Sequence, residues 1–301
     1  MTDATSNPWR AAQRLFAALE QRYVPKATPL DFATVAAARW VPGPLGGDFA
    51  AGGAIDGVTL NDLVGMDRQR ERVLANVAQF VAGLPANNML LWGARGTGKS
   101  SLVHGVLNHF FAEGLRLIEV ERDALGDLQE ISARVASLPQ RFLVFCDDLS
   151  FEGPELGYKA LKTALEGTVF AAAGNVMLVA TSNRRHLMPE RAAENQQFTH
   201  HENGEVHPGE TTEEKLSLAD RFGLWVSFQP MAQPAYLEAA ARWVAHYGGP
   251  HGLPFDDAAR AAALTWALTR GARSGRVAHH FARHWVGQAV LQQRHKASAG
   301  A

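Results

Sequence analysis

One short stretch, GARGTGKS at residues 93–100, constrains the fold of this 301-residue chain more than any other feature. It follows an apolar run, residues 89–92, and it precedes a stretch in which apolar residues recur at helical spacing. Its three glycines let successive backbone N–H groups turn toward a common centre, and the following helix points its positive end at that centre. The pattern therefore predicts a loop between a strand and a helix that holds phosphate groups.

The residues of this loop, together with the serine that follows it, are candidate ligands for a nucleotide. Lys99 is expected to reach the β- and γ-phosphate oxygens, and Ser100 is expected to bind Mg²⁺. A simple glycine-rich turn is a weaker interpretation, because the loop lies between a strand and a helix as the chemistry requires. The predicted cofactor-binding residues here are Gly93, Ala94, Arg95, Gly96, Thr97, Gly98, Lys99, Ser100 and Ser101.

Two carboxylates follow a second apolar run, residues 142–146, and form a Walker B pattern. They would lie at the carboxyl end of a strand, where doubly wound sheets bind ligands. Asp147 is expected to hold Mg²⁺ through water, and Asp148 is expected to polarise the attacking water. Paired acids also occur as helix N-caps, but the phosphate loop upstream favours the catalytic interpretation. Glu152, four residues beyond Asp148, is an alternative base.

A third apolar run, residues 176–181, leads into Ser182 and Asn183. If this strand lies parallel to and beside the run that ends in the two acids, Asn183 faces the γ-phosphate or the attacking water. A polar residue that merely closes a strand is a common alternative. The assignment of Asn183 therefore depends on the first two motifs.

Short apolar runs alternate with amphipathic stretches between residues 58 and 230, which predicts an α/β fold with a parallel sheet between helices. The expected strands are residues 88–93, 115–120, 142–147, 176–181 and 224–228. Beyond Pro230 the strand signals stop, so a smaller all-helical unit is expected over residues 231–301. Its helices are expected at residues 235–246, 256–269 and 274–293.

The first 57 residues are expected to form a helical segment and a linker. Large apolar residues recur at helical spacing over residues 8–24, and residues 30–40 continue in a similar style. Residues 41–57 contain six glycines and two prolines, which disfavour both regular structures.

Several functional classes are disfavoured by composition. No secretory signal opens the chain and no apolar run approaches the ~20 residues of a bilayer span, so we expect a cytoplasmic protein without a membrane partner. The single cysteine, Cys146, lies in an apolar run and is expected to be a buried, inert thiol. His200, His201 and His207 lie in a polar stretch, residues 190–214, that predicts a loop rather than a metal site.

The formal net charge of −1 indicates no overall attraction to nucleic acid. From Ala235 onward, however, the sequence contains eight Lys and Arg residues but only three Asp and Glu residues, together with six His residues. This excess is consistent with a surface for nucleic acid or for an acidic partner, although a solvated helical face is the commoner explanation.

These motifs follow one another in the order of an AAA+ module, and the chain resembles the AAA+ ATPases among the P-loop NTPases. The stretches at residues 94–101, 146–152, 181–187 and 213–218 closely resemble an uncharacterised family of bacterial AAA+ ATPases, catalogued as a domain of unknown function. A more distant likeness is to bacterial replication initiators and helicase loaders. The resemblance implies an AAA+ core over residues 58–230, a helical lid over residues 231–301 and a helical N-terminal segment with a linker over residues 1–57.

The resemblance also implies roles for individual residues. Asn183 corresponds to the sensor-1 position, and Arg221 corresponds to an arginine finger that enters a neighbouring subunit's ATP site. Arg276 corresponds to sensor 2, with Arg273 as the alternative. A surface arginine remains an equal alternative for Arg221 considered alone.

The function implied is binding and hydrolysis of Mg·ATP by a homo-oligomer that drives or gates remodelling of a client protein or DNA. Val64 and Gly65 would contact the adenine base. The alternative is a nucleotide-gated binding module, for DNA or a replication partner, with little turnover. A P-loop kinase is disfavoured because it would not need Arg221 at a subunit edge, and a GTPase is disfavoured because no Asn-Lys-x-Asp signature follows any strand.

Overall fold

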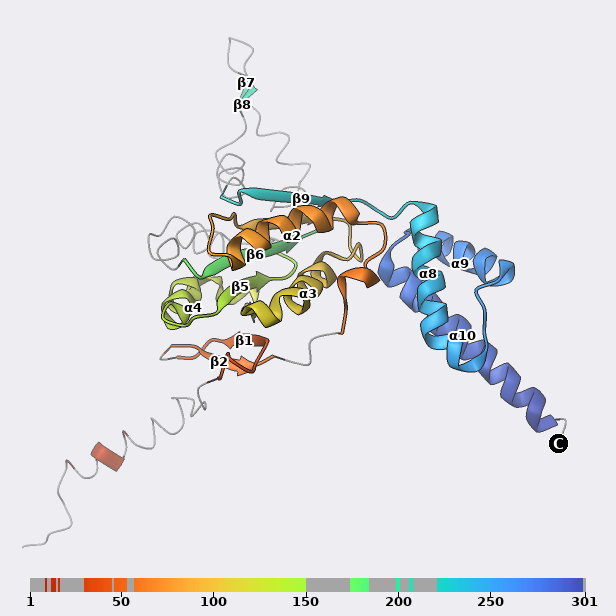
Figure 1. The fold of residues 1–301 in the computed structure, drawn as a ribbon, viewed down its shortest axis with the longest axis horizontal. Coiled ribbons are helices and arrows are strands. Elements are labelled where there is room, and N and C mark those ends of the chain that lie inside the picture. The colour runs from red at the N-terminus through yellow and green to blue at the C-terminus, as the bar shows by residue number, and fades with distance from the viewer. Residues whose placement is uncertain are drawn as a thin grey trace, which may run out of the picture.

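The computed structural model describes residues 30–44, 46–52, 57–149, 174–183, 199–200, 206–207 and 221–299, with five residues of the N-terminal stretch, 9, 12–14 and 16. In this part of the chain, a sheet with helices on both faces lies beside a cluster of three long helices (Figure 1). The helix expected over residues 8–24 falls largely outside the described residues.

A seven-stranded sheet of order β2-β1-β4-β5-β6-β3-β9 forms the centre of the core. Every neighbouring pair is parallel except β1 and β2, which are antiparallel. The predicted parallel sheet and its five predicted strands are therefore confirmed. The strands are β1 (Ala37–Val41), β2 (Asp48–Ala51), β3 (Met89–Gly93), β4 (Leu115–Glu119), β5 (Arg141–Cys146), β6 (Val176–Ser182) and β9 (Leu224–Phe228).

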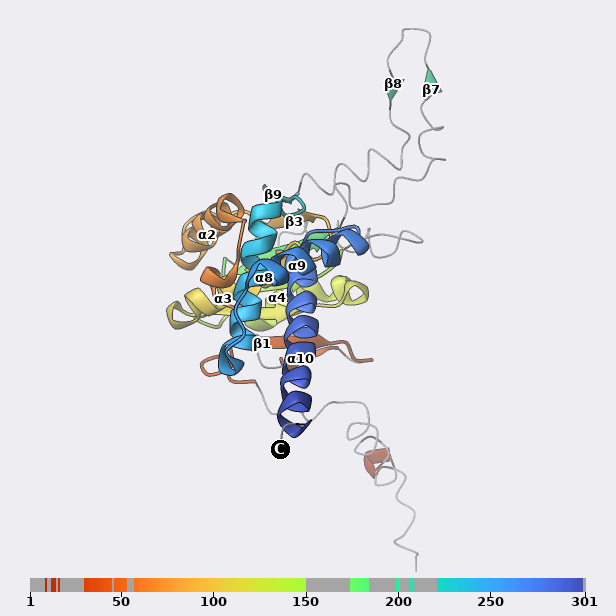
Figure 2. The ribbon, with the colours of Figure 1, turned by 90° about the vertical axis from the view of Figure 1, so that its right-hand side faces the viewer.

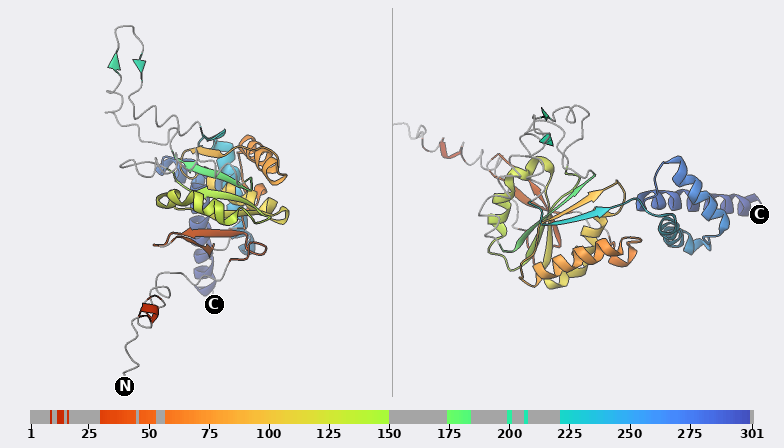
Figure 3. Two further views of the ribbon diagram at one scale, coloured as in Figure 1. Left: turned by 90° about the vertical axis from the view of Figure 1, so that its left-hand side faces the viewer. Right: turned by 90° about the horizontal axis from the view of Figure 1, so that it is seen from above.

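Helices cover the sheet on each side (Figure 3), so the central strands are buried on both faces. In β5, Phe142, Val144 and Cys146 join one apolar cluster, while Leu143 and Phe145 join the other. The first cluster includes residues of one of the three long core helices that the structure describes, and the second includes residues of the other two. The helices are α4 (Leu128–Val135) on the first side and α2 (Asp67–Val81) and α3 (Lys99–Phe110) on the second.

Residues 37–41 form strand β1, so the helix expected over residues 30–40 is wrong in this part. Ala38 and Trp40 are buried while Arg39 and Val41 are exposed, which is the period-two pattern of a strand. The alanine-rich sequence favours a helix locally. Pairing with the open edge of β4 outweighs that propensity.

The glycine- and proline-rich stretch at residues 41–57 is likewise more than a linker, because β2 lies within it and pairs with β1. The sheet therefore begins before residue 58, where we expected the core to start. Division of the chain into separate domains at residues 57 and 230 stays a prediction.

The C-terminal unit, hereafter the lid, consists of three helices that share an apolar core of their own. Tyr236, Ala263 and Phe281, one from each helix, are buried together in that core. The longest helix runs alongside the first and continues past it (Figure 2). The three predicted helices are thus confirmed as α8 (Gln233–Gly248), α9 (Asp257–Thr269) and α10 (Gly275–Ala299).

The remaining described elements are short. Strands β7 and β8 pair antiparallel within the polar stretch that we expected to be a loop. None of the helices in the described residues is long and apolar enough to cross a bilayer. The short elements are β7 (Thr199–His200), β8 (Val206–His207) and the 3-10 helices η1 (Leu60–Asp62), η2 (Phe111–Glu113), η3 (Arg122–Asp127) and η4 (Gly249–His251).

Arg116 fastens the segment before β1 to the core. Its guanidinium is buried, with 5% of the residue exposed, and burial lowers its pKa. It donates to Phe32 O at 2.5 Å and Ala33 O at 3.0 Å, on the segment that leads into β1. It also donates to Phe111 O at 3.0 Å and Leu115 O at 2.7 Å. One side chain therefore satisfies carbonyl groups from three parts of the chain.

We expect Arg116→Ala to lower the free energy of unfolding by about 2 to 4 kcal/mol, because it leaves several carbonyl groups of the core without their donor. Chemical denaturation followed by circular dichroism measures the change. Arg39→Ala, which removes an exposed arginine of β1, is the matched control and should cost under about 0.5 kcal/mol. Equal stability of the two variants would contradict the role of Arg116.

Candidate nucleotide-binding site

The glycine-rich loop between β3 and α3 has the backbone that its sequence predicts. Gly93, Gly96 and Gly98 have φ angles of 140°, 75° and 93°, a region that side chains other than hydrogen disfavour. A Cβ atom at Gly93 would lie 2.0 Å from Phe228 O, so glycine alone lets the loop leave β3 beside β9. Helix α3 begins directly after Gly98, and its free N–H groups therefore face the loop.

The loop closes around the side chain of Lys99, which is only 7% exposed. Its ammonium group donates to Gly93 O at 2.8 Å, Ala94 O at 2.9 Å and Asn183 Oδ1 at 3.0 Å. Burial lowers the pKa of Lys99, while nearby carboxylates act in the opposite direction. Among the described residues, no carboxylate lies within ion-pair distance of Lys99. A largely desolvated cation therefore lies at a helix N-terminus with neutral oxygens as its hydrogen-bond partners, an arrangement suited to an anion.

Asp147 and Ser100 meet at the edge of this loop. Ser100 Oγ donates to Asp147 Oδ1 at 2.8 Å, and Thr181 Oγ1 donates to the same oxygen at 2.5 Å. Ser100 is half-buried and Asp147 is exposed, so their oxygens are accessible. Hard oxygen donors of this kind fit Mg²⁺.

Thr181 is a residue to which sequence analysis assigned no role. Its hydroxyl also accepts a hydrogen bond from the backbone N–H of Asp148 at 2.8 Å, so it fixes both acids. The parallel register pairs Cys146 with Ala180, which brings the next residues, Asp147 and Thr181, together. Only the register between β5 and β6 reveals the role of Thr181, and a single sequence does not specify that register.

Asp148 has an unusual backbone and two side-chain partners. Its φ of 53° makes it the sole non-glycine residue with positive φ in the described chain. Asn183 Nδ2 donates to Asp148 Oδ1 at 2.5 Å, and Arg95 Nη2 lies 3.4 Å from Asp148 Oδ2. Because Asn183 also accepts from Lys99, a continuous chain of hydrogen bonds joins the phosphate loop to the second acid. Arg95 is 74% exposed, so its ion pair with Asp148 is weak.

The start of α10 lies against the phosphate loop. A Cβ atom on Gly96 would be 2.9 Å from Ser274 Oγ and 3.2 Å from the Cβ of Arg276. Arg273 O accepts a hydrogen bond from the Met231 backbone at 3.0 Å, and the side chains of Arg273 and Arg276 are both exposed. The lid therefore contacts the phosphate loop through the start of α10, the segment that contains the two candidate sensor-2 arginines.

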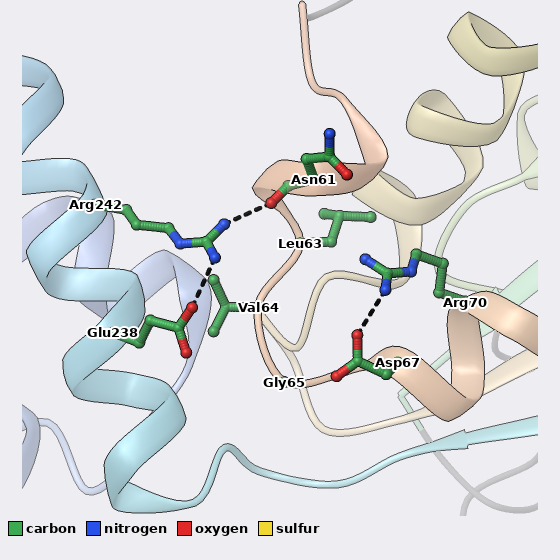
Figure 4. A pocket seen from close by; sticks show the side chains of 8 residues that line it. All are labelled: Asn61, Leu63, Val64, Gly65, Asp67, Arg70, Glu238 and Arg242. Atoms are coloured by element: carbon green, nitrogen blue, oxygen red, sulfur yellow. Dashed lines mark hydrogen bonds and ion pairs between the residues drawn. The ribbon is translucent and has the colours of Figure 1, made fainter.

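Val64 and Gly65 contact the lid from the core. Val64 is buried in the apolar core of the lid, and Gly65 has a φ of 72°. They border a cavity of about 370 Å³ between η1, α2 and α8 (Figure 4). The cavity is lined by Asn61, Leu63, Val64, Gly65, Asp67, Arg70, Glu238 and Arg242.

Two arginines of this cavity are already paired. Arg242, from the lid, donates to Asn61 O at 2.5 Å and forms an ion pair with Glu238 at 2.7 Å. Arg70 forms an ion pair with Asp67 at 2.7 Å on the opposite wall (Figure 4). The hydrogen bond from Arg242 to Asn61 O therefore joins the lid to the core.

Residues 33–289 match the model of a protein family described as "Protein of unknown function (DUF815)". The chain belongs to this family. No curated protein matches its sequence.

Solved structures show which fold this DUF815 chain has. Two point variants of RuvB from Thermotoga maritima superpose with TM-scores of 0.52 and 0.51 and sequence identities of 16%. The matches cover 78% and 76% of the DUF815 chain and 67% and 64% of the RuvB chains. The replication initiator DnaA, bound to AMPPCP and single-stranded DNA, has a TM-score of 0.50 at 15% identity and matches over 80% of this chain and 69% of its own. At such identities the likeness shows only the fold, which is that of the P-loop AAA+ proteins. The chain spans less than two thirds of the length of the second RuvB variant.

One predicted residue of the DUF815 chain, Arg221, lies apart from the loop. Arg221 is exposed and precedes the first residue of β9, whereas Gly93 pairs with the last residue of that strand, Phe228. The loop and Arg221 are therefore at opposite ends of a parallel pair, roughly 20 Å apart along the strand. Glu152 lies outside the described residues.

Ser101 and Thr97 complete the predicted set. Ser101 lies half-buried in the first turn of α3, and the hydroxyl of the buried Thr97 donates to Ala94 O at 2.8 Å within the loop. The histidines of β7 and β8 belong to a segment whose side chains are not described, and the described residues elsewhere contain no cluster of potential metal ligands.

Proposed function

We propose that this protein binds Mg·ATP at the loop between β3 and α3 and hydrolyses it as a homo-oligomer, and that this reaction drives or gates remodelling of a client protein or DNA. The observation that carries the proposal is the buried ammonium of Lys99, which has three neutral oxygen partners and lies at a helix N-terminus. Phosphate oxygens would give this ammonium group anionic hydrogen-bond partners in place of neutral ones.

The loop backbone and Lys99 bind the phosphates in this proposal. The three positive-φ glycines leave N–H groups free to face the β-phosphate, and α3 adds the positive end of its dipole. Lys99 exchanges its carbonyl partners for phosphate oxygens. Arg276, at the start of α10, would contribute a second positive charge from the lid.

Mg²⁺ would be held by Ser100 and by Asp147, the latter through water. The pair of accessible oxygens, orientated by Thr181, fits this ion. When bound, Mg²⁺ neutralises charge on the β- and γ-phosphate oxygens. Thr181 holds Asp147 Oδ1 beside Ser100 Oγ, so the carboxylate would need little rearrangement to take up the ion.

The cavity beside Val64 and Gly65 supports adenine binding there. Its lining is mostly polar: Leu63 and Val64 supply the apolar part, while Asn61 and Glu238 provide polar groups that can recognise a base edge. Because Arg242 of the lid contacts Asn61 of the core, a base in this cavity would touch both parts. Nucleotide occupancy would therefore alter how the lid lies on the core.

Asp148 is the proposed base for the attacking water. Its Oδ1 is held by Asn183, whereas its Oδ2 has, among the described residues, the exposed Arg95 at 3.4 Å as its one partner, so Oδ2 is the oxygen proposed to accept a proton. Asn183 would orient both this carboxylate and the γ-phosphate through Lys99. Glu152 is the alternative base.

A second candidate is a nucleotide-gated binding module with little turnover, possessing the same ATP site. The hydrogen bond from Asn183 to Asp148 favours it, because a short carboxylate restrained in this way reaches water less readily than a free one. Phosphate release without any added acceptor separates the two candidates. Sustained release supports the ATPase, and stoichiometric retention of ATP supports the module.

Lys99→Ala should weaken ATP binding by about 100-fold or more, because it removes the charged donor opposite the β- and γ-phosphates. Isothermal titration calorimetry measures the affinity. Arg72→Ala, which removes an exposed cation of α2, is the control and should bind ATP normally. Unchanged affinity in a folded Lys99→Ala protein would remove the basis of the proposal.

Asp148→Asn should retain Mg·ATP but lose turnover by about 100-fold or more, since it keeps the shape of the side chain and removes its basic oxygen. Asp147→Asn should instead raise the Mg²⁺ concentration needed for turnover. Both are measured by steady-state phosphate release. Loss of turnover in Glu152→Gln alone would assign the base to Glu152.

Arg221→Ala should bind ATP normally yet hydrolyse it roughly 10³ to 10⁵ times more slowly, if Arg221 acts on a neighbouring subunit's nucleotide. Its position at the far end of β9 from the loop of its own chain supports action between subunits. Mixing Arg221→Ala with Lys99→Ala protein should restore some activity, because one mixed interface contains both intact groups. No rescue in variants shown to co-assemble would contradict action in trans.

A further inference from the structure

Helix α10 continues well beyond the nucleotide site and carries an unusual charge pattern. It contains 25 residues, about 37 Å of helix, without a single Asp or Glu. It begins at the phosphate loop and extends past α8 and α9 to the end of the described chain (Figures 1 and 2). The helix therefore presents a long surface that lies outside the proposed ATP site.

Three arginines form a line along this helix. Arg276, Arg283 and Arg294 lie within about 20° of one another around the helix axis, given ~100° per residue, and all three are exposed. The buried side chains of the helix, such as Ala278, Ala282 and Val286, lie on the other side. We call the exposed side beyond the first turn, with His280, Arg283, His284 and Arg294, the basic face of α10.

Two of the three acidic groups of the lid have other partners. Glu238 pairs with Arg242, and Asp256 caps α9 by accepting from Ala259 N at 2.8 Å. Among the described residues, none forms an ion pair with Arg283 or Arg294. The positive charge of this face is therefore available to an external partner.

Neighbouring α9 extends the same surface. The guanidinium of Arg270 lies 3.4 Å above the ring of Trp266, and His284 of α10 stacks on that ring at 4.7 Å with an interplanar angle of 29°. This stack holds Arg270 beside the basic face at its middle. Cationic and aromatic groups thus alternate across two helices.

We propose that the basic face of α10 binds the phosphate backbone of a nucleic acid. Arg283 and Arg294 are separated by about 16 Å along the axis, and a nucleic acid presents phosphates at regular spacing over such a distance. Guanidinium groups bind phosphate through paired hydrogen bonds, which favours arginine at such sites. The proposal does not depend on ATP hydrolysis.

Other partners fit this surface less well. A docked protein would need apolar anchors, and the only large apolar side chain that α10 exposes strongly in its described part is Leu291, at 56%. A membrane would need an apolar side of the helix to be free, but that side packs against α8. Phosphate groups in a row require neither.

Binding is tested with the full chain, without added nucleotide, by fluorescence anisotropy of labelled oligonucleotides. Three labelled probes distinguish the kind of nucleic acid: duplex DNA, single-stranded DNA and RNA. Each is about 30 nucleotides long, which is more than twice the length of α10. The test variant is Arg283→Glu with Arg294→Glu. The matched control is Arg68→Glu with Arg72→Glu, which changes the net charge equally at two exposed positions of α2.

We expect the unmodified chain to bind at least one of these nucleic acids, with an affinity that falls as salt rises from roughly 50 to 200 mM. The test variant should bind about tenfold or more weakly, with a salt dependence reduced by about two counterions, while the control binds normally. Circular dichroism establishes that each variant is folded. The proposal would be overturned if both variants lost affinity equally, or if the unmodified chain bound none of the oligonucleotides. It would also be overturned if polyglutamate bound as tightly and lost as much affinity in the test variant, because that result would indicate an acidic protein partner.

Discussion

The parallel pairing of β5, β6 and β3 is the constraint on which the rest of the structure depends. It brings the carboxyl ends of three strands to one edge, where the phosphate loop, the two acids and Asn183 meet. The hydrogen bonds among these groups span from 35 to 84 residues of sequence, and only a shared register can hold such distant segments at hydrogen-bond distance. Thr181 is the clearest consequence, because its hydroxyl joins both acids only while β5 and β6 keep their alignment.

Close packing at glycines links this edge to the rest of the molecule. Gly93 lets the loop pass the backbone of β9, and Gly96 lets Ser274 and Arg276 of the lid approach the loop. A side chain at either place would force strand or lid away. The lid is thus in contact with the loop that we propose to hold phosphate, which gives a physical route from nucleotide occupancy to lid orientation.

Helix α10 combines two properties in one rigid element. Its first turn packs on the phosphate loop, and its remaining length carries the basic face outward. An AAA+ fold by itself specifies no client, because function resides in surfaces added to a shared core. In this DUF815 protein the surface charge of the lid is the feature that points to a class of partner, nucleic acid.

The sequence by itself determined the elements whose signal is local. The strand, glycine-rich loop and helix at residues 89–110 follow from apolar periodicity and from backbone angles that glycine tolerates, and the three lid helices follow from their spacing alone. Only the tertiary structure decided that residues 37–41 form a strand, that Arg116 ties their segment to the core and that Asp148 has a positive φ. Each of these depends on partners distant in the chain, whose pairing energy outweighs local propensity and is invisible in a short stretch of sequence.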